Sequence, residues 1–227
     1  MTLTGLLGGS FNPAHGGHRR VSLAAAAALG LDDVWWLVSP GNPLKPEKGM
    51  APLAARFASA RRAARRAPIR PTAIEAELGT VYTIDTLAAL VRRYPRRRFI
   101  WLMGADNLAQ FHRWRDWREI ARTVPIAVMT RPGYHGRALK APAWGWLRRF
   151  VRPAAEARHW TRWRLPALVL LSIPPDRTSA TALRAADPQW HEKAMKSFHP
   201  QAFRDGVTRK PLSVRRQFAR TRTRSAD

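Results

Sequence analysis

The chain has 227 residues, of which 45% are hydrophobic, and this allows one large or two small domains with a buried core. It contains no cysteine, which excludes disulfides, thiolate catalysis and cysteine-ligated zinc. The apolar runs, such as Leu165–Ile173, are too short to span a bilayer, and no signal-peptide pattern opens the chain, so we expect a cytoplasmic location.

The net charge is strongly positive, at +25 from 40 lysines and arginines against 15 aspartates and glutamates. Residues 188–227 contain 10 basic and 3 acidic side chains, a net charge of +7, and residues 1–187 contain 30 and 12, a net charge of +18. A basic body favours polyanionic partners or substrates with several phosphates. Arginine-rich composition spread over solvated faces would give the same charge, so charge alone does not assign a function.

Six apolar runs are typical of strands: Leu3–Leu7, Val34–Val38, Ile69–Ile74, Phe99–Met103, Ile126–Met129 and Leu168–Ile173. Helical patterns alternate with these runs. Alternation of this kind predicts crossover units and therefore an α/β, Rossmann-like, doubly wound fold, with a mostly parallel sheet and helices on both faces.

The helices are bounded by recognisable start and stop residues. We expect helices over residues 17–29 with Gly30 as the stop, over Pro52–Arg66, from Thr83 to a stop at Pro95, just after Asp106, from Asp116 with Glu119 as a capping-box partner, and over Ser179–Ala186.

One globular domain, residues 1–187, is the simplest organisation. Residues 133–164 interrupt the alternation with many Trp, Arg and Pro residues, and we interpret them as an insertion or an irregular helical excursion. After Pro188 the hydrophobic periodicity is lost, so residues 188–227 are predicted to form a basic, disordered C-terminal tail.

The stretch GGSFNPAHGGHRR, residues 8–20, lies between the first predicted strand and the first predicted helix. Glycines at the end of a parallel strand allow backbone N–H groups to approach an anion, and the following helix N-terminus favours negative charge. His15 and His18 are three residues apart and can project toward the same side. A zinc site would need a third ligand, which the neighbouring sequence lacks, so no metal ligand is predicted. An ordinary glycine turn would leave the two histidines unexplained.

This stretch resembles the GGxFxPxHxGH signature of the nucleotidyltransferase superfamily, in which the spaced histidines contact the triphosphate of the nucleotide. Asn12 stands where that family often has Asp. The stretch RTSATALRA, residues 177–185, could be only a capped helix, but it resembles the S-x-T-x-(I/L)-R motif that closes the ATP site of the same superfamily.

Three further stretches resemble nicotinate-mononucleotide adenylyltransferases within that superfamily. SPGNPLKPEKG (39–49) resembles a loop that often reads P-P-H-K, with Leu44 in place of the histidine and Lys45 retained. YTIDTL (82–87) resembles the segment that helps to bind the pyridine nucleotide. WLMGADNLAQFHRWRDW (101–117) resembles a run whose tryptophan, here Trp114, stacks on the nicotinate ring, whereas Phe111 and Trp117 are expected in the core.

The resemblance covers residues 1–187 and includes MTRPGY (129–134), where Arg131 is placed to contact substrate. It implies transfer of the adenylyl group from ATP to nicotinate mononucleotide, with Mg²⁺ as cofactor. The implied catalytic residues are His15, His18, Lys45 and Arg184. The implied ATP-binding residues are Gly8, Gly9, Ser10, Phe11, His15, His18, Gly104, Asp106, Ser179, Thr181 and Arg184, and those for the mononucleotide are Asn12, Lys45, Tyr82, Thr83, Thr86, Trp114 and Arg131.

Two alternatives stay open. The acceptor could be nicotinamide mononucleotide or another phosphorylated molecule such as phosphopantetheine, because acid and amide differ by one or two hydrogen bonds. The charge and the ten tryptophans could also indicate a nucleic-acid-binding protein, which would bind with a steep salt dependence. The basic residues are spread along the chain, however, and do not form a recognisable nucleic-acid-binding module. A homo-oligomer is compatible with the sequence.

Overall fold

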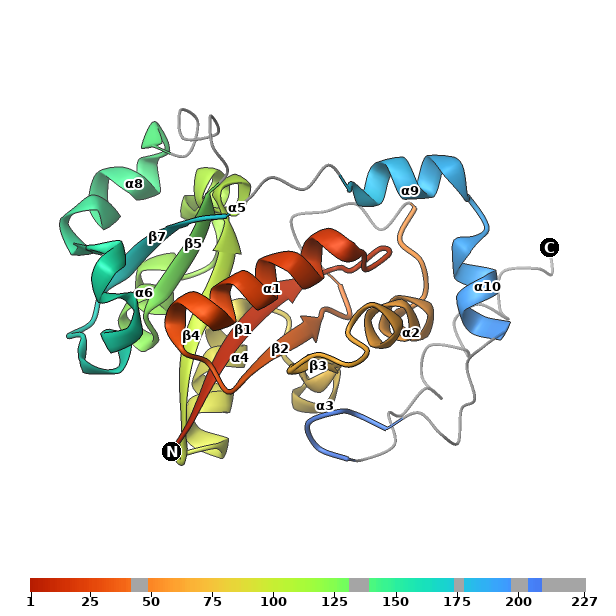
Figure 1. Cartoon of the computed structure of the whole chain (residues 1–227), viewed down its shortest axis with the longest axis horizontal. Coiled ribbons are helices and arrows are strands. Elements are labelled where there is room, and N and C mark those ends of the chain that lie inside the picture. Colours follow the sequence, from red (N-terminus) through yellow and green to blue (C-terminus); the bar gives the residue numbers. More distant parts are fainter. Residues whose placement is uncertain (42–48, 131–138, 174–177, 197–203, 210–227) are drawn as a thin grey trace.

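The structure is a computed structural model, and it describes residues 1–41, 49–130, 139–173, 178–196 and 204–209. Its centre is a seven-stranded sheet in the order β3-β2-β1-β4-β5-β7-β6, and every pair of neighbouring strands is parallel (Figure 1). The strands are β1 Thr2–Gly9, β2 Asp33–Val38, β3 Ile69–Thr72, β4 Arg97–Gly104, β5 Ile126–Thr130, β6 Val151–Arg152 and β7 Leu168–Ser172. The predicted doubly wound parallel sheet is confirmed.

The chain reverses its direction of travel across the sheet between β1 and β4. From β1 it moves outward through β2 to β3, and it then returns to place β4 on the other side of β1. Crevices at such switch points, beyond the carboxyl ends of the strands, are where open α/β sheets bind ligands. Gly8 and Gly9 end β1, and Gly104 ends β4, so these three predicted site residues lie at this edge.

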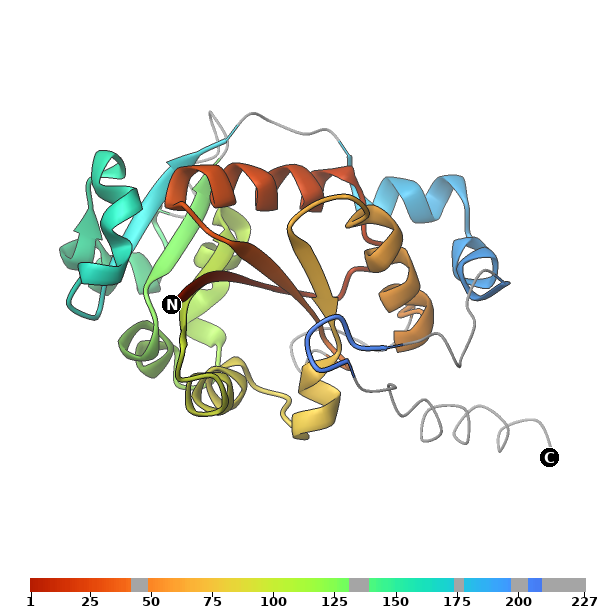
Figure 2. The same cartoon turned by 60° about the horizontal axis from the view of Figure 1, so that its bottom comes forward.

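Helices cover both faces of the sheet (Figure 2). The first face carries α1 Gly16–Leu29, α2 Leu53–Ala63 and the 3-10 helix η3 Ala154–Arg162. The second face carries α3 Ile74–Leu78, α4 Thr83–Arg93, α5 Ala105–Gln110, the 3-10 turn η1 Phe111–Arg113, α6 Trp117–Thr123 and α8 Pro142–Leu147. Neighbouring residues of β2 and β4 face alternate layers, so their nearly continuous apolar sequence fills both cores.

Several helix ends lie where the sequence predicts them, whereas the predictions for Asp116 and Ile74 are wrong. Gly30 ends α1 with a φ of 65°, and the Ser179 side chain accepts a hydrogen bond from the Ala182 N–H at the start of α9, Ala180–Ala186. The expected capping box at Asp116 is wrong, because Asp116 has a φ of 48° and caps α6 with no side-chain hydrogen bond. Ile74, predicted as strand, instead begins α3, where it is buried beneath the sheet.

Residues 139–164 are irregular, as predicted. They contain α8, the 3-10 turn η2 Arg148–Phe150, the two-residue edge strand β6 and η3. The buried indole of Trp160 donates its Nε1–H to the Leu29 carbonyl at 3.0 Å, which fixes this segment to the end of α1.

The segment after Pro188 differs from the tail that the sequence predicts. Residues Trp190–Lys196 form helix α10, which packs against α2. Asp205 is buried and accepts hydrogen bonds from the Thr72 hydroxyl, the Ala73 N–H and two amides of its own turn. The loss of periodicity in the sequence therefore does not mean loss of structure over residues 190–196 and 204–209. Within the described ranges, no helix has the length and apolar character needed to cross a membrane.

Candidate active site

The glycines at the switch point make room for side chains as well as for a ligand. A Cβ on Gly8 would stand 2.6 Å from the ring of Trp101, which is buried in β4 beside it. A Cβ on Gly104 would collide with the Asp106 carboxylate. Asp106 is exposed in the first turn of α5, and Gly104 is the N-cap residue of that helix. Close packing of Trp101 is thus a second reason for glycine at position 8, one that the motif alone does not indicate.

Residues 10–14 form a turn that is held from several sides; we call it the histidine turn. Phe11 is buried with a φ of 48°, a left-handed conformation that disfavours a side chain, and its ring stacks on Trp36 at 5.0 Å. The Ser10 carbonyl accepts a hydrogen bond from Arg56, and the Ala14 N–H donates to the Ser59 hydroxyl at 3.1 Å. The surrounding side chains therefore fix a backbone conformation that the residues themselves do not favour.

His15 and His18 lie together at the N-terminus of α1. His15 caps the helix, and its Nδ1 accepts a hydrogen bond from the Gly17 N–H at 3.1 Å. The Nδ1 of His18 accepts one from the His15 N–H at 3.3 Å, and the two ring centroids are 4.0 Å apart. Because both Nδ1 atoms are acceptors, the proton of each neutral ring is assigned to Nε2. The two imidazoles are thereby oriented, by the backbone, as a pair of N–H donors.

His18 is a neutral donor at physiological pH. Burial, followed by repulsion from His15, lowers the pKa of His18 from 6.5 to about 3. The ring also packs against Phe11, with centroids 4.9 Å apart. An anion at this edge would meet the Nε2–H of a neutral ring and the helix N-terminus, without a proton having to be taken up first.

The stretch around α9 contacts the histidine turn. Arg184, in α9, donates from Nη1 to the Asn12 carbonyl at 2.6 Å and from Nη2 to the Thr181 hydroxyl at 3.2 Å. Ser179 and Thr181 are both exposed around the start of α9. This contact spans 172 positions of the chain, and it places the Arg184 guanidinium beside the histidine turn.

The Asn12 side chain bonds to two residues just before α2. Its Nδ2 donates to the Gly49 carbonyl at 3.0 Å, and its Oδ1 accepts from the Ala51 N–H at 3.2 Å. Both ends of the amide are therefore engaged within the chain. Lys45 and Arg131, two residues predicted to contact substrate, lie outside the described residues.

The start of α4 is held by a hydroxyl and a buried carboxyl. Thr86 is buried, and its hydroxyl bonds with Thr80, with the Tyr82 carbonyl and with the Glu75 carboxyl. Burial raises the pKa of Glu75 to about 7, although hydrogen bonds from Thr86 and Ser39 act in the opposite direction. Tyr82 is the N-cap residue of α4, without a side-chain hydrogen bond. Sequence reasoning missed Glu75, which joins α3, α4 and the end of β2.

Of the aromatic residues after β4, Phe111 lies in the core as expected, whereas Trp117, also expected there, is half-buried and packs against the core from its border. Phe111 is fully buried, whereas Trp114 is half-buried and meets Trp101 and Phe111 edge-on, with centroids 6.1 and 5.4 Å apart. Tyr82 is 37% exposed and lies under the Arg115 guanidinium, 4.7 Å from its ring centroid. Trp114 thus meets other rings edge-on, and Tyr82 is covered on one face by a cation.

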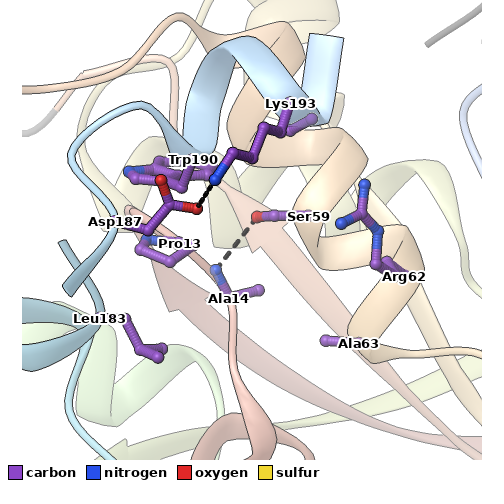
Figure 3. A pocket seen from close by; sticks show the side chains of 10 residues that line it. Pro13, Ala14, Ser59, Arg62, Ala63, Leu183, Asp187, Trp190 and Lys193 are labelled. Atoms are coloured by element: carbon purple, nitrogen blue, oxygen red, sulfur yellow. Dashed lines mark hydrogen bonds and ion pairs between the residues drawn. The ribbon is translucent and has the colours of Figure 1, made fainter. Parts of the chain in front are cut away.

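A cavity of about 310 Å³ opens between α2, α9 and α10 (Figure 3). Pro13 and Ala14 of the histidine turn form one wall, and Trp190 and Lys193 of α10 form another, with Lys193 paired to Asp187 at 2.9 Å. None of the predicted site residues lines it. The cavity therefore lies behind the histidine turn, and we place the chemistry at the sheet edge instead.

The described residues contain no group of three histidine, aspartate or glutamate side chains that could hold a metal ion. A magnesium ion does not need such a cage when it arrives on a nucleotide, since it retains several waters and is bound by phosphate oxygens with few protein ligands.

Comparison with known proteins agrees with this geometry. The family described as cytidylyltransferase-like matches residues 6–186, which include the histidine turn and α9. The fold and this edge of the sheet define the class: the chain is a nucleotidyltransferase with a cytidylyltransferase-like domain.

The relatives identify the family more closely. The chain is 62% identical over 204 residues, 90% of its length, to 89% of a probable nicotinate-nucleotide adenylyltransferase of Erythrobacter litoralis. It is 53% identical over 180 residues, 79% of its length, to 90% of a probable nicotinate-nucleotide adenylyltransferase of Parvibaculum lavamentivorans. The chain belongs to the nicotinate-nucleotide adenylyltransferase family.

The fold is also shared with a solved structure. The nicotinic acid mononucleotide adenylyltransferase of Plasmodium falciparum, complexed with NaAD, superimposes with a TM-score of 0.60 at 14% identity, over 82% of this chain and 83% of that one.

Proposed function

We propose that this chain transfers the adenylyl group of ATP to nicotinate mononucleotide, which gives deamido-NAD and pyrophosphate. The observation that carries the proposal is the pair of oriented imidazoles at the switch point, beside Arg184 and two helix N-termini. The names of the close relatives support the acceptor, and so does the NaAD complex of the structural neighbour.

The reaction needs no covalent intermediate. An oxygen of the mononucleotide 5′-phosphate attacks the α-phosphorus of ATP in line. The new bond joins that oxygen to the α-phosphorus, the bond from the α-phosphorus to the bridging oxygen breaks, and pyrophosphate leaves with the electron pair. Catalysis then consists of positioning the two phosphates and stabilising the negative charge that develops.

His15 and His18 hold the triphosphate and the leaving pyrophosphate in this mechanism. Their Nδ1 atoms are engaged by the backbone, so each ring presents Nε2–H to a phosphate oxygen. Arg184 adds a fixed cation beside them. Lys45 is proposed to align the attacking phosphate. The metal enters as part of the substrate, as magnesium-bound ATP, and supplies neutralisation of phosphate charge.

The acceptor is bound on the other side of the switch point. Tyr82, Thr83 and Thr86 begin α4, and Trp114 follows β4, so the two segments border one region of the second face. We propose that Trp114 stacks on the pyridine ring and that Arg131 and Asn12 complete the site. Asn12 would act there through its backbone, because its amide already bonds with Gly49 and Ala51.

Pyrophosphate release from ATP and magnesium tests the proposal, with nicotinate mononucleotide and nicotinamide mononucleotide compared as acceptors. We expect a strong preference for the acid. Preference for the amide would retain the mechanism and contradict the acceptor. Folded protein that releases pyrophosphate with neither would overturn the proposed function.

A further inference from the structure

Arg56 is a buried cation in the middle of α2. Its side chain is 2% exposed, although α2 otherwise carries its arginines on the surface. A buried charge is costly unless something compensates for the loss of water, so its surroundings indicate what it does.

The guanidinium joins three segments at the ligand-binding edge. Nη1 donates to the Ser10 carbonyl at 2.8 Å and to the Ser39 carbonyl at 2.7 Å. Nε donates to the Ala51 carbonyl at 2.8 Å, and Nη2 makes a longer contact with Pro40. Arg56 thus binds the histidine turn, the first residues after β2 and Ala51, just before α2.

Every acceptor of Arg56 is a neutral carbonyl. Among the described residues no carboxylate forms an ion pair with it. Burial lowers the pKa of Arg56 to about 10, so the side chain remains charged at neutral pH. A full positive charge therefore lies beside the turn that precedes His15, and no carboxylate of the described residues pairs with it.

Ser59 extends the same contact along α2. Its hydroxyl donates to the Arg56 carbonyl at 2.7 Å and accepts from the Ala14 N–H. Arg56 and Ser59 are three residues apart on one helical face. They form hydrogen bonds with the two ends of the histidine turn, Ser10 and Ala14.

We propose that Arg56 is a positioning residue for adenylyl transfer, which holds the histidine turn against Ser39 and Ala51 through their carbonyls and adds a buried positive charge behind the phosphates. The inference rests on the proposed function. Hydrogen bonds alone could be made by a neutral side chain at a lower desolvation cost. The retained charge is explained by phosphates that pass in front of it, because charges in a poorly screened environment act over several ångströms.

Four variants test the proposal: Arg56→Met, Arg56→Lys, Arg56→Ala and, as a matched control, Arg61→Met on the exposed side of the same helix. We expect Arg56→Met to lower kcat/KM for ATP about 100-fold, because small displacements of catalytic groups cost this much. Arg56→Lys should raise kcat/KM about tenfold above that of Arg56→Met, since lysine restores the positive charge but not the several N–H donors of the guanidinium. Arg61→Met should match the wild type. Equal activity of Arg56→Met and the wild type would overturn the proposal.

A second measurement separates positioning from simple loss of stability. Millimolar methylguanidinium should raise kcat of folded Arg56→Ala several-fold, whereas methylammonium at the same ionic strength should raise it less. A variant that remains folded by circular dichroism and is inactive with and without methylguanidinium would contradict the proposal.

Failure of the proposed function is recognised separately. If the wild-type protein transfers no adenylyl group to nicotinate mononucleotide, calorimetric binding of inorganic tripolyphosphate still tests Arg56. Weaker binding to Arg56→Met than to Arg61→Met supports the inference, and equal binding overturns it.

Discussion

The histidine turn and the start of α4 lie at the same edge of the sheet, but they are held in different ways. The histidine turn is bound at Ser10, Asn12 and Ala14 by side chains from α2 and α9, and its aromatic residue is buried. At the start of α4, Tyr82 is exposed, and Trp114 nearby is half-buried. The side that would bind a triphosphate is therefore prearranged, whereas the side that would bind the acceptor retains rings able to adjust around a ligand.

The largest expected effect is on the prearranged side. His18→Ala removes one N–H donor and should lower kcat by about 100-fold to 1000-fold, the usual effect of losing one such donor, with the fold intact. Pyrophosphate release measures kcat, and circular dichroism checks the fold. His159→Ala, an exposed histidine in η3, is the control and should leave kcat unchanged. Near wild-type turnover of His18→Ala would remove His18 from the mechanism.

The next effect concerns stability on the acceptor side. The pKa of Glu75 is raised from 4.5 to about 7, so its stabilising contribution is complete below pH 4.5 and is lost as the pH rises through 7. Glu75→Gln should remove this pH dependence. Between acid and mildly alkaline pH, the free energy of unfolding of the wild type should fall by up to about 3 kcal/mol more than that of Glu75→Gln. Urea titrations across this range measure it, and parallel curves for the two proteins would contradict the assignment.

Asp205 stabilises the same side of the sheet edge as Glu75, because it anchors the end of β3 just before α3. Asp205→Ala leaves the buried Thr72 hydroxyl and the Ala73 N–H without their acceptor, and it should cost about 2 kcal/mol of stability. The midpoint of urea unfolding should fall while KM for ATP stays near the wild-type value. A midpoint equal to that of the wild type would mean that residues 204–209 do not stabilise the sheet.

The smallest effect tests the adjustable rings. Trp114→Ala should raise KM for nicotinate mononucleotide about tenfold through loss of stacking, with KM for ATP nearly unchanged. Trp114→Phe retains a ring, and its KM for nicotinate mononucleotide should lie between those of the wild type and Trp114→Ala. If only KM for ATP rose, Trp114 would contact ATP and not the acceptor.

The sequence predicts the parts whose causes are local. The order of strands and helices follows from alternating apolar runs, and Gly30 and Ser179 act as expected because helix ends depend on neighbouring residues. Arg56 could not be identified in this way, since it lies in an alanine- and arginine-rich helix and only the tertiary fold distinguishes it from Arg61. Asp205 bonds to Thr72, 133 positions away, and no local pattern signals such a pair.

The failed cap at Asp116 has a different physical origin. Asp116 and Glu119 have the spacing of a capping box, but the left-handed backbone at Asp116 does not direct its side chain toward the helix amides. The Glu119 carboxylate pairs with Arg122 instead. A motif of two residues specifies a cap only when the chain enters the helix in an extended conformation.

The packing of α10 on α2 has a practical consequence for anyone who shortens this chain. The region shared with cytidylyltransferase-like proteins ends at residue 186, and a truncation there looks natural from sequence comparison. Such a fragment would lose α10 from the outer side of the helix that carries Arg56 and Ser59, and it would lose Asp205 from the edge strand. The boundary of the family match at residue 186 therefore does not coincide with the end of the packed structure.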